Sequence, residues 1–256
     1  MPAVDIHLFP CLKDNYGVLV HENVSKVTAS IDAPAAGAVR AALAEKGWQL
    51  THILATHHHN DHVAGIADLK SETGCKVIGP RAEESRIPGI DVALGDGEIY
   101  RLGSLEVQVL DTPGHTVGHV CYWIPEAKIA FTGDTLFAMG CGRVFEGTPE
   151  MMWNSLQKIM RLPKDTAIYC GHEYTLANAR FGLTIEPSNE KLRARLKAVV
   201  ELRAKGLPTI PTRLDIELET NVFLRPNVLQ IRSNLGLGAA ADWRVFAEIR
   251  ERKNKS

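Results

Sequence analysis

Residues 56–62 read Thr-His-His-His-Asn-Asp-His, and this stretch decides how the rest of the chain is interpreted. Four of the ten histidines of the chain fall within it, together with one aspartate. The apolar segment at residues 52–55 comes directly before it, so the cluster lies where a strand ends and a loop begins, a common place for functional groups. Neutral imidazole and carboxylate suit zinc and similar divalent ions. The stretch therefore predicts a metal site.

The spacing within this stretch predicts two ions. Alternate side chains on an extended backbone point the same way, so His57 and His59 are expected to share one ion while His58 points elsewhere. Asp61 and His62 lie past a turn and are expected to reach a second ion nearby. A bound cation also relieves the repulsion among so many ligand-type side chains. The cluster is dense enough to favour a two-metal site over packing.

Three more candidate ligands each follow a predicted strand and a glycine. They are His115 after the strand at residues 105–110, Asp134 after residues 128–131 and His172 after residues 167–169. Glycine lets the backbone turn tightly, so that the next side chain can face a shared centre. One buried His or Asp alone is more often structural than catalytic. Their repetition at strand ends, added to the first cluster, favours the metal site.

The remaining histidines lack this context. His7, His21 and His52 are expected to serve surface or core packing. His58 is also interpreted as structural, whereas His119 fits either packing or the orientation of a neighbouring ligand.

Composition excludes several classes of protein. The chain has 256 residues, of which 45% are hydrophobic and 23% are charged, as in an ordinary globular protein. The net charge of −1 gives no general attraction to nucleic acid or to anionic lipid. Five scattered cysteines without CxxC spacing favour a reduced, intracellular protein. Without a long apolar run or a signal-peptide pattern, no membrane association and a cytoplasmic location are expected.

Short strands and helices alternate through the first two-thirds of the chain, which predicts an α/β architecture. Strands are predicted at residues 105–110, 119–124, 128–132 and 167–170, and helices at residues 34–46, 64–73 and 149–162. The Asp96-Gly97 pair is typical of a β-hairpin turn. From about residue 175 the pattern changes to helices, predicted at residues 188–205 and 240–252.

Residues 56–62 resemble the signature of the metallo-β-lactamase superfamily. Within it, the chain is most similar to the hydroxyacylglutathione hydrolases, the glyoxalase II family. The segments that carry this likeness are residues 111–119, 131–137, 140–147 and 171–175, of which Gly-Cys-Gly at 140 and Gly-His-Glu-Tyr-Thr at 171 are the most specific. The resemblance implies a four-layer αβ/βα sandwich at residues 1–174 and a smaller helical, substrate-binding domain at residues 175–256.

The resemblance also implies which of the candidate ligands would bind each ion. His57, His59 and His115 would hold the first ion. Asp61, His62 and His172 would hold the second, and Asp134 would bridge both, which makes Asp134 and Asp61 the expected catalytic carboxylates. The family uses two divalent ions per chain, usually zinc, with iron or manganese as alternatives. It hydrolyses S-(2-hydroxyacyl)glutathione, above all S-D-lactoylglutathione, in the second step of methylglyoxal detoxification.

Five side chains match positions that bind glutathione in this family: Arg143, Phe145, Tyr174, Arg250 and Lys253. Arg143 keeps the cation where lysine is common in eukaryotic relatives. Phe145 stands where tyrosine is common, so one hydroxyl hydrogen bond to glutathione is in doubt. Arg250 and Lys253 are three residues apart on a predicted helix and share a face. The plain alternative is that both are solvated tail charges.

Several rival functions share the same ligand chemistry. A mononuclear-iron persulfide dioxygenase of the same superfamily is the main alternative, and a lactonase or β-lactamase is the next. A nuclease of this fold is disfavoured by the net charge of −1. A purely structural metal domain is disfavoured because such zinc sites are usually closed and rich in cysteine. We expect a monomer that acts on a small glutathione thioester.

Overall fold

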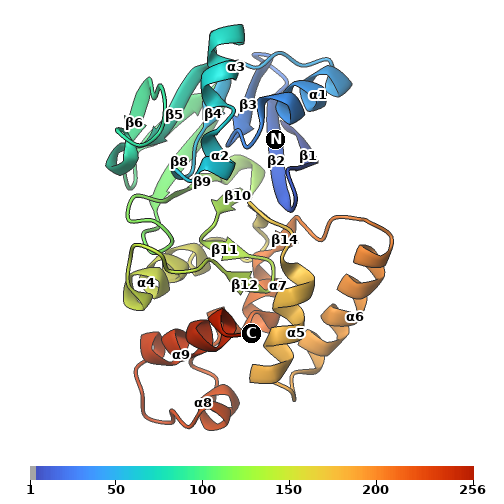
Figure 1. Cartoon of the computed structure of the whole chain (residues 1–256), viewed down its shortest axis with the longest axis vertical. Coiled ribbons are helices and arrows are strands. Elements are labelled where there is room, and N and C mark those ends of the chain that lie inside the picture. The colour runs from blue at the N-terminus through green and yellow to red at the C-terminus, as the bar shows by residue number, and fades with distance from the viewer. Residues whose placement is uncertain (1–3) are drawn as a thin grey trace. The chain divides into compact units, whose positions relative to one another are not determined.

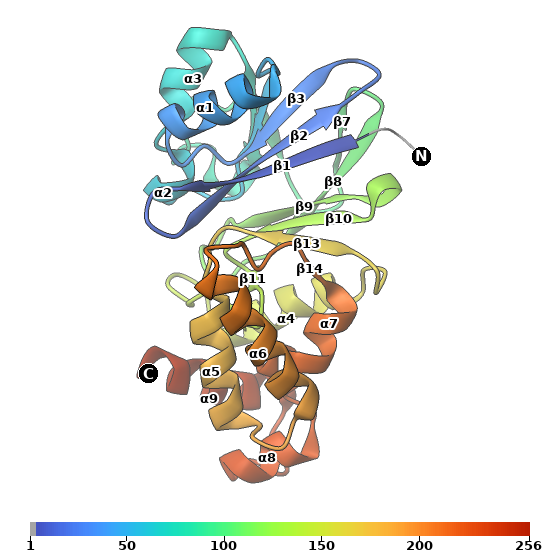
Figure 2. The same ribbon diagram turned by 90° about the vertical axis from the view of Figure 1, so that its right-hand side faces the viewer.

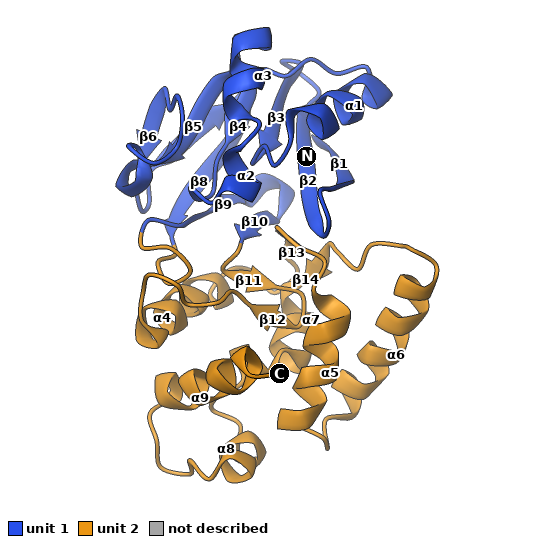
Figure 3. Cartoon of the chain, viewed as in Figure 1, with its two compact units in different colours: residues 1–111, 118–133 blue, residues 112–117, 134–256 orange. Residues whose placement is uncertain are grey.

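The computed structural model describes residues 4–256, and the chain divides into two compact units. Unit 1 comprises residues 1–111 and 118–133, and unit 2 comprises residues 112–117 and 134–256 (Figure 3). Helices and strands occur in both units (Figure 1), so the predicted α/β class is confirmed. The boundary predicted from the sequence, between residues 174 and 175, divides the chain by function and not by compactness. It stays a prediction.

The first sheet belongs wholly to unit 1. Its strands are β1 Val4–Cys11, β2 Asn15–Glu22, β3 Val27–Ile31, β4 His52–Leu54, β5 Lys76–Pro80 and β6 Val92–Leu94. They follow one another in the order β1-β2-β3-β4-β5-β6. β1, β2 and β3 pair antiparallel, whereas β3 to β6 pair parallel. Parallel neighbours bring the ends of β3, β4 and β5 to one edge of the sheet, where the first ligand cluster begins.

Helical segments connect the parallel strands. They are α1 Ala36–Lys46, α2 Asn60–Val63, α3 Ile66–Thr73 and the 3-10 helix η1 Arg81–Glu83. Gly47 and Gly74 end α1 and α3 with φ of 67° and 68°, the left-handed conformation expected of glycine after a helix. The predicted ends of both helices are therefore confirmed, although each begins two residues later than predicted. The short α2 was not predicted from the sequence.

Both faces of the first sheet are buried. Leu19, Ile53 and Val77 belong to a core cluster that also contains Val39 of α1 and Leu69 of α3. Figure 2 shows α1 and α3 on this face and strands β8 Leu105–Asp111, β9 Val120–Ile124 and β10 Ile129–Gly133 on the other. Side chains that alternate with the core cluster along β2 are also fully buried, because they point toward that second layer.

The second layer of unit 1 is antiparallel. β7 Ile99–Leu102, β8 and β9 pair in turn, and β9 pairs with β10 after the 3-10 helix η2 Pro125–Ala127. The predicted alternation at residues 105–109 is confirmed, since Leu105, Val107 and Val109 are fully buried. The hydroxyl of Tyr122 on β9 donates to the carbonyl of Ala55 at 2.6 Å and so ties this layer to the end of β4.

The predicted hairpin at Asp96-Gly97 is wrong. These residues connect β6, which pairs with β5, to β7, which pairs with β8, so they join two sheets instead of two partners. Gly97 does adopt the positive φ of a turn, at 77°. The local signal was correct for a turn, but each flanking strand adds to a different sheet, β6 beside β5 and β7 beside β8.

Unit 2 is mostly helical. Its elements are β11 Leu136–Phe137, β12 Gly140–Cys141, α4 Pro149–Met160, β13 Ala167–Cys170, α5 Thr175–Ile185, α6 Glu190–Ala204, β14 Thr212–Arg213, α7 Leu214–Thr220, η3 Val222–Leu224, α8 Leu229–Leu235 and α9 Asp242–Asn254. The predicted cap of α4 is confirmed, because the Thr148 side chain accepts from the backbone N–H of Met151. The predicted helices at residues 188–205 and 240–252 correspond to α6 and α9.

Four aromatic rings form the centre of the helical core of unit 2. Trp153 of α4 lies 6.0 Å from Phe246 of α9, and Phe246 lies 6.2 Å from Phe223 of η3. Phe223 in turn stacks on Phe181 of α5 at 5.9 Å. The rings therefore join helices that are up to about a hundred residues apart in sequence, and they give α9 a fixed place in unit 2.

Candidate metal centre

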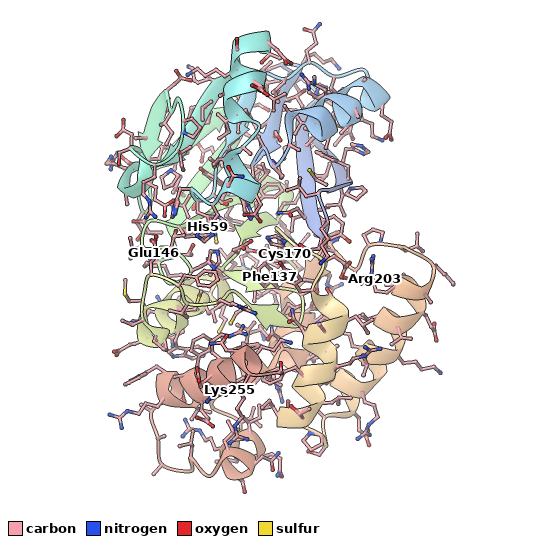
Figure 4. All side chains as sticks on the ribbon, in the orientation of Figure 1. His59, Phe137, Glu146, Cys170, Arg203 and Lys255 are labelled. Atoms are coloured by element: carbon pink, nitrogen blue, oxygen red, sulfur yellow. The ribbon has the colours of Figure 1, made fainter. Side chains whose placement is uncertain are left out.

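The first ligand cluster begins in the loop after β4, which carries His57 and His59, and continues into α2, which carries Asp61 and His62. The side chain of His59 is labelled in Figure 4. The loop begins at a fully buried Ala55 and is fixed at Thr56, whose carbonyl accepts from the backbone N–H of Val120 at 2.9 Å. The backbone N–H of Thr56 donates to Asp32 Oδ1 at 2.7 Å. Two hydrogen bonds, one with Val120 and one with Asp32, thus fix the backbone of Thr56, the residue directly before His57.

The four candidate ligands of this loop gather closely. His57 Nε2 lies 3.1 Å from His59 Nδ1, and the rings of His57 and His62 are 4.2 Å apart. His62 Nε2 lies 3.7 Å from Asp61 Oδ2. Asp61 is further oriented by Asn15, whose amide donates to Oδ2 at 3.1 Å. Their nitrogen and oxygen atoms face one another as ligands of metal ions do.

Asp32 orients this cluster, and the sequence reasoning missed it. Its Oδ2 lies 2.7 Å from His62 Nδ1 and 2.9 Å from the hydroxyl of Thr56. With Nδ1 held by a carboxylate, the Nε2 of His62 is left to bind an ion. A signal was present, because Asp32 directly follows the buried strand β3 as the other candidates follow theirs.

The second cluster belongs to unit 2. His115 Nε2 and His172 Nε2 each lie 3.4 Å from Asp134 Oδ2, and all three side chains are nearly or fully buried. His115 Nδ1 hydrogen-bonds to the carbonyl oxygen of Arg143 at 2.9 Å, which directs Nε2 toward Asp134. Two imidazoles that converge on one carboxylate oxygen suit a shared divalent cation, so the donor set fits a metal site.

Glycines make room for this cluster. A Cβ at Gly142 would lie 1.9 Å from the carbonyl oxygen of Asp134 and 3.3 Å from His115 Nδ1. A Cβ at Gly114, where φ is 151°, would lie 2.9 Å from the backbone of Met152. Both substitutions would displace the backbone beside a candidate ligand. These contacts explain why glycine precedes His115 and follows Cys141.

The other histidines have structural partners. His21 Nδ1 lies 2.8 Å from the hydroxyl of Thr28, and its ring stacks on Trp48 at 4.6 Å. Burial lowers the pKa values of His21 and His52, so both favour the neutral form expected of packed rings. His58 Nδ1 lies 2.9 Å from Glu83, away from the ligand cluster. These contacts agree with the structural interpretation of all three.

His119 lies beside the ligands. It is fully buried, and its ring centroid lies 4.8 Å from that of His57. A Cβ at Gly133 would come within 2.7 Å of His119 Nε2 and 2.8 Å of the Thr56 hydroxyl. This packing against a ligand favours the orienting role over a distant packing role.

The candidate glutathione-binding side chains lie near the second cluster. Phe145 is 61% exposed, and its ring lies 5.2 Å from that of His115. Tyr174 stacks on His172 at 4.8 Å and is also partly exposed. Two exposed aromatic rings therefore lie directly beside buried candidate ligands.

The basic candidates differ from one another in burial. Arg250 is 6% exposed, donates to the carbonyl of Cys141 at 2.8 Å and lies over the Phe223 ring. Lys253 lies over Phe181, and its pKa is lowered by burial and by the positive charges of Arg250 and Arg143. Lys253 is therefore close enough to Arg250 and Arg143 to experience their positive charges.

The cysteines offer no nucleophile. All five are free and buried. Burial raises the pKa of Cys141 to about 11 and that of Cys170 to about 12, so both thiols stay protonated at neutral pH. The reactive form of cysteine is the thiolate. Cys141 and Cys170 are therefore disfavoured as nucleophiles.

The chain is similar to known proteins along nearly its whole length. Residues 29–172 match the family model of the metallo-beta-lactamase superfamily, and residues 173–256 match that of the hydroxyacylglutathione hydrolase C-terminus. The chain is 54% identical to hydroxyacylglutathione hydrolases of Brucella anthropi and of Rhizobium meliloti, in each case over 99% of this chain. The match covers 97% of the Brucella protein and 99% of the Rhizobium protein.

Solved structures agree on the fold. The structure of the B3 metallo-beta-lactamase BLEG-1 superimposes on this chain with a TM-score of 0.67 and a sequence identity of 20%. The superposition covers 86% of this chain and 99% of the BLEG-1 chain. The structure of ETHE1 from Myxococcus xanthus superimposes with a TM-score of 0.59 and a sequence identity of 31%. The superposition covers 67% of this chain and 76% of the ETHE1 chain. The fold and the paired His–Asp clusters define a metal-dependent enzyme of the metallo-β-lactamase superfamily.

Within that superfamily, the chain belongs to the hydroxyacylglutathione hydrolase family, glyoxalase II. The predicted family, enzyme class and metallo-β-lactamase-like fold with a helical C-terminal part are therefore confirmed. Among residues 4–256, no helix is both long and apolar enough to span a membrane.

Proposed function

We propose that this chain hydrolyses S-(2-hydroxyacyl)glutathione, above all S-D-lactoylglutathione, to glutathione and D-lactate. The observation that carries the proposal is the identity of 54% to hydroxyacylglutathione hydrolases over 99% of the chain. In this proposal residues 1–174 form the catalytic part and residues 175–256 the substrate-binding part. The reaction is the second step of methylglyoxal detoxification.

The proposed ligands form two sets that share Asp134. His57, His59 and His115 bind the first ion, whereas Asp61, His62 and His172 bind the second. The assignment follows the family resemblance, and each unit supports its own part of it. Unit 1 gathers His57 with His59 and Asp61 with His62, whereas unit 2 directs His115 and His172 toward Asp134 Oδ2. Imidazole and carboxylate suit zinc best, with iron or manganese as alternatives.

Bound divalent ions supply Lewis acidity for the thioester carbonyl and lower the pKa of a water toward neutrality. The chain itself keeps the donor atoms in position. Asp32 holds His62, and the carbonyl of Arg143 holds His115, so the ring nitrogens that face the centre are fixed before substrate arrives. A thiolate is a good leaving group, so no strong general acid from the chain is needed.

The glutathione moiety is proposed to bind against the second cluster. Phe145 and Tyr174 offer exposed ring surface, while Arg143 and Lys253 offer charges for the carboxylates of glutathione. Arg250 is proposed to stabilise the glutathione-binding region through packing, because its buried guanidinium donates a hydrogen bond to the Cys141 carbonyl. Phe145 lacks the hydroxyl of the tyrosine common at this position in the family, so one fewer hydrogen bond to glutathione is expected.

The remaining expectations concern the setting of the enzyme. We propose a monomer that works in the cytoplasm, without nucleic acid or membrane as a partner. The net charge of −1 supports only the last point, since it gives no general attraction to nucleic acid or to anionic lipid.

The proposal is tested by the hydrolysis rate of S-D-lactoylglutathione before and after metal removal, followed by addition of zinc, iron or manganese. We expect fast release of glutathione that is lost on chelation and restored by metal. Absence of thioester turnover in fully metal-loaded protein would contradict the proposal. Oxygen uptake with glutathione persulfide would then support the rival dioxygenase.

A further inference from the structure

We propose that Glu83 is a positioning residue that fixes the direction of the His57 and His59 side chains by holding His58 and Gly118. The proposal rests on the proposed function, because it takes His57 and His59 as metal ligands. Glu83 itself lies outside both ligand clusters, in η1 of unit 1, and its side chain is fully buried.

The carboxylate of Glu83 binds the middle of the ligand loop. Its Oε2 accepts from the backbone N–H of His58 at 2.6 Å and lies 2.9 Å from His58 Nδ1. A buried carboxylate is retained where several N–H groups satisfy it, and hydrogen bonds to a charged acceptor are short and strong. His58 is therefore held by both its backbone and its ring.

Holding His58 also determines where its neighbours point. Side chains on either side of a residue in an extended segment point opposite to it. The ring of His58 lies 6.4 Å from that of His57 and 4.8 Å from that of His59, and its Nδ1 faces Glu83, whereas His57 Nε2 and His59 Nδ1 face each other at 3.1 Å. If the backbone at His58 rotates, both donor atoms move together. The two contacts of Glu83 Oε2, with the backbone N–H and with Nδ1 of His58, oppose that rotation.

The second oxygen of Glu83 binds another loop. Oε1 accepts from the backbone N–H of Gly118 at 3.2 Å. A Cβ at Gly118 would lie only 2.4 Å from Glu83 Cγ and 3.0 Å from Ala82 Cβ, so this position needs a glycine to admit Glu83. The next residue is His119, whose ring packs against His57. Glu83 thus connects the ligand loop to the residue that supports its first histidine.

The test measures metal affinity by competition with a chelator, using the full chain. Glu83→Gln keeps the shape of the side chain but places an amide N–H against at least one N–H donor. Loss of a hydrogen bond made directly to a metal ligand typically weakens metal binding about 10–100-fold. Because Glu83 acts through the residue between two ligands, we expect a loss at the lower end, about 10-fold. Hydrolysis at limiting zinc should fall in parallel and recover when zinc is in excess. The exposed neighbour provides the control, since Glu84→Gln should change neither quantity.

Two further variants keep the test decisive if Glu83→Gln folds poorly. Gly118→Ala should weaken metal affinity in the same direction by pushing Glu83 away, and His58→Gln should do so less, since the backbone bond to Glu83 is kept. Wild-type affinity in variants with an unchanged unfolding temperature would overturn the role of Glu83 while leaving the proposed function intact. Wild-type protein that neither binds metal nor hydrolyses the thioester would overturn both.

Discussion

The ring of Tyr174 lies parallel to the imidazole of His172, with centroids 4.8 Å apart and an angle of 4° between the planes. The two residues are separated only by Glu173, whose carboxylate accepts from the backbone N–H and the hydroxyl of Thr209. A candidate metal ligand and a candidate substrate contact are thus parts of one rigid turn. A change in the tyrosine should affect both functions.

The first prediction separates these functions. Tyr174→Phe keeps the stacked ring and should raise KM with little effect on metal binding. Tyr174→Ala should raise KM further and also weaken metal affinity about 2- to 10-fold, because an aromatic pair contributes about 0.5–1.5 kcal/mol. Steady-state kinetics and chelator competition on both variants check this. Equal metal affinity in wild type and Tyr174→Ala would show that the stack does not support His172.

The second prediction concerns the shared carboxylate. Asp134→Ala should lower kcat/KM by about 100-fold or more, the scale seen when a key electrostatic group is removed from an active site. The reason is that His115 and His172 both converge on Asp134 Oδ2. Metal content and turnover are measured together. Two bound ions with full activity in this variant would rule out the bridging role.

The third prediction contrasts two basic residues of α9. Lys253→Met should raise KM for the glutathione thioester about 10-fold, which corresponds to about 1.4 kcal/mol of lost binding, and leave stability nearly unchanged. Arg250→Met should instead lower the free energy of unfolding by about 1.5–3 kcal/mol, since the buried guanidinium hydrogen-bonds to Cys141.

The comparison is made by urea unfolding and steady-state kinetics on both variants. If Lys253→Met binds the substrate as well as wild type does, Lys253 has no role in binding. It would then be only a solvated charge of the C-terminal helix, which is the alternative that the sequence leaves open. A stable Arg250→Met protein with raised KM would place Arg250 in contact with substrate instead of beneath it.

The fourth prediction concerns a buried ion pair that supports the β11–β12 turn. Glu217 is fully buried, pairs with Arg195, and accepts from the backbone N–H of Met139 at 2.8 Å and from the Asn221 amide at 3.0 Å. Removing one partner of such a pair leaves an unpaired buried charge, so Glu217→Ala should cost about 3–5 kcal/mol.

A surface pair provides the control for this experiment. Glu219 pairs with Lys191, and both side chains are at least half exposed. Glu219→Ala should change the free energy of unfolding by less than about 1 kcal/mol. Similar losses in the two variants, measured by urea denaturation, would contradict the importance assigned to burial.

The fifth prediction concerns acid stability. Burial by itself would raise the pKa of Glu22, but hydrogen bonds from the backbone N–H groups of Ser25 and Val24 dominate and lower this pKa to about 2. The value in an unfolded chain is about 4.3. A lowered folded-state pKa stabilises the protein above the unfolded value, and that contribution is lost as the pH falls from about 4.3 toward 2.

Glu22→Gln should therefore reduce stability at pH 7 more than at pH 3. The measurement is the difference in unfolding free energy between wild type and variant across this range, which cancels the contribution of other carboxylates. A difference that does not change with pH would mean that Glu22 has an ordinary pKa in the folded chain.

Local sequence determined much of this protein. The dense run at residues 56–62 identified the ligand loop, because so many imidazoles and a carboxylate rarely coincide without a metal. Thr148 and Gly47 marked helix ends correctly, since caps depend only on the few adjacent residues. The specific segments around Gly171 identified the family.

Only the tertiary structure decided which partners meet. Asp32 and Glu83 each orient the ligand loop across 24 or more residues of sequence. Asp32 follows a buried strand, but nothing in the residues around either carboxylate indicates that it meets this loop. The turn at Asp96-Gly97 had the chemistry of a hairpin but joins two sheets, since β6 pairs with the distant strand β5 and β7 pairs with β8. Backbone conformation is set largely by neighbours in sequence, whereas hydrogen bonds to buried charges depend on what folding brings within about 3 Å.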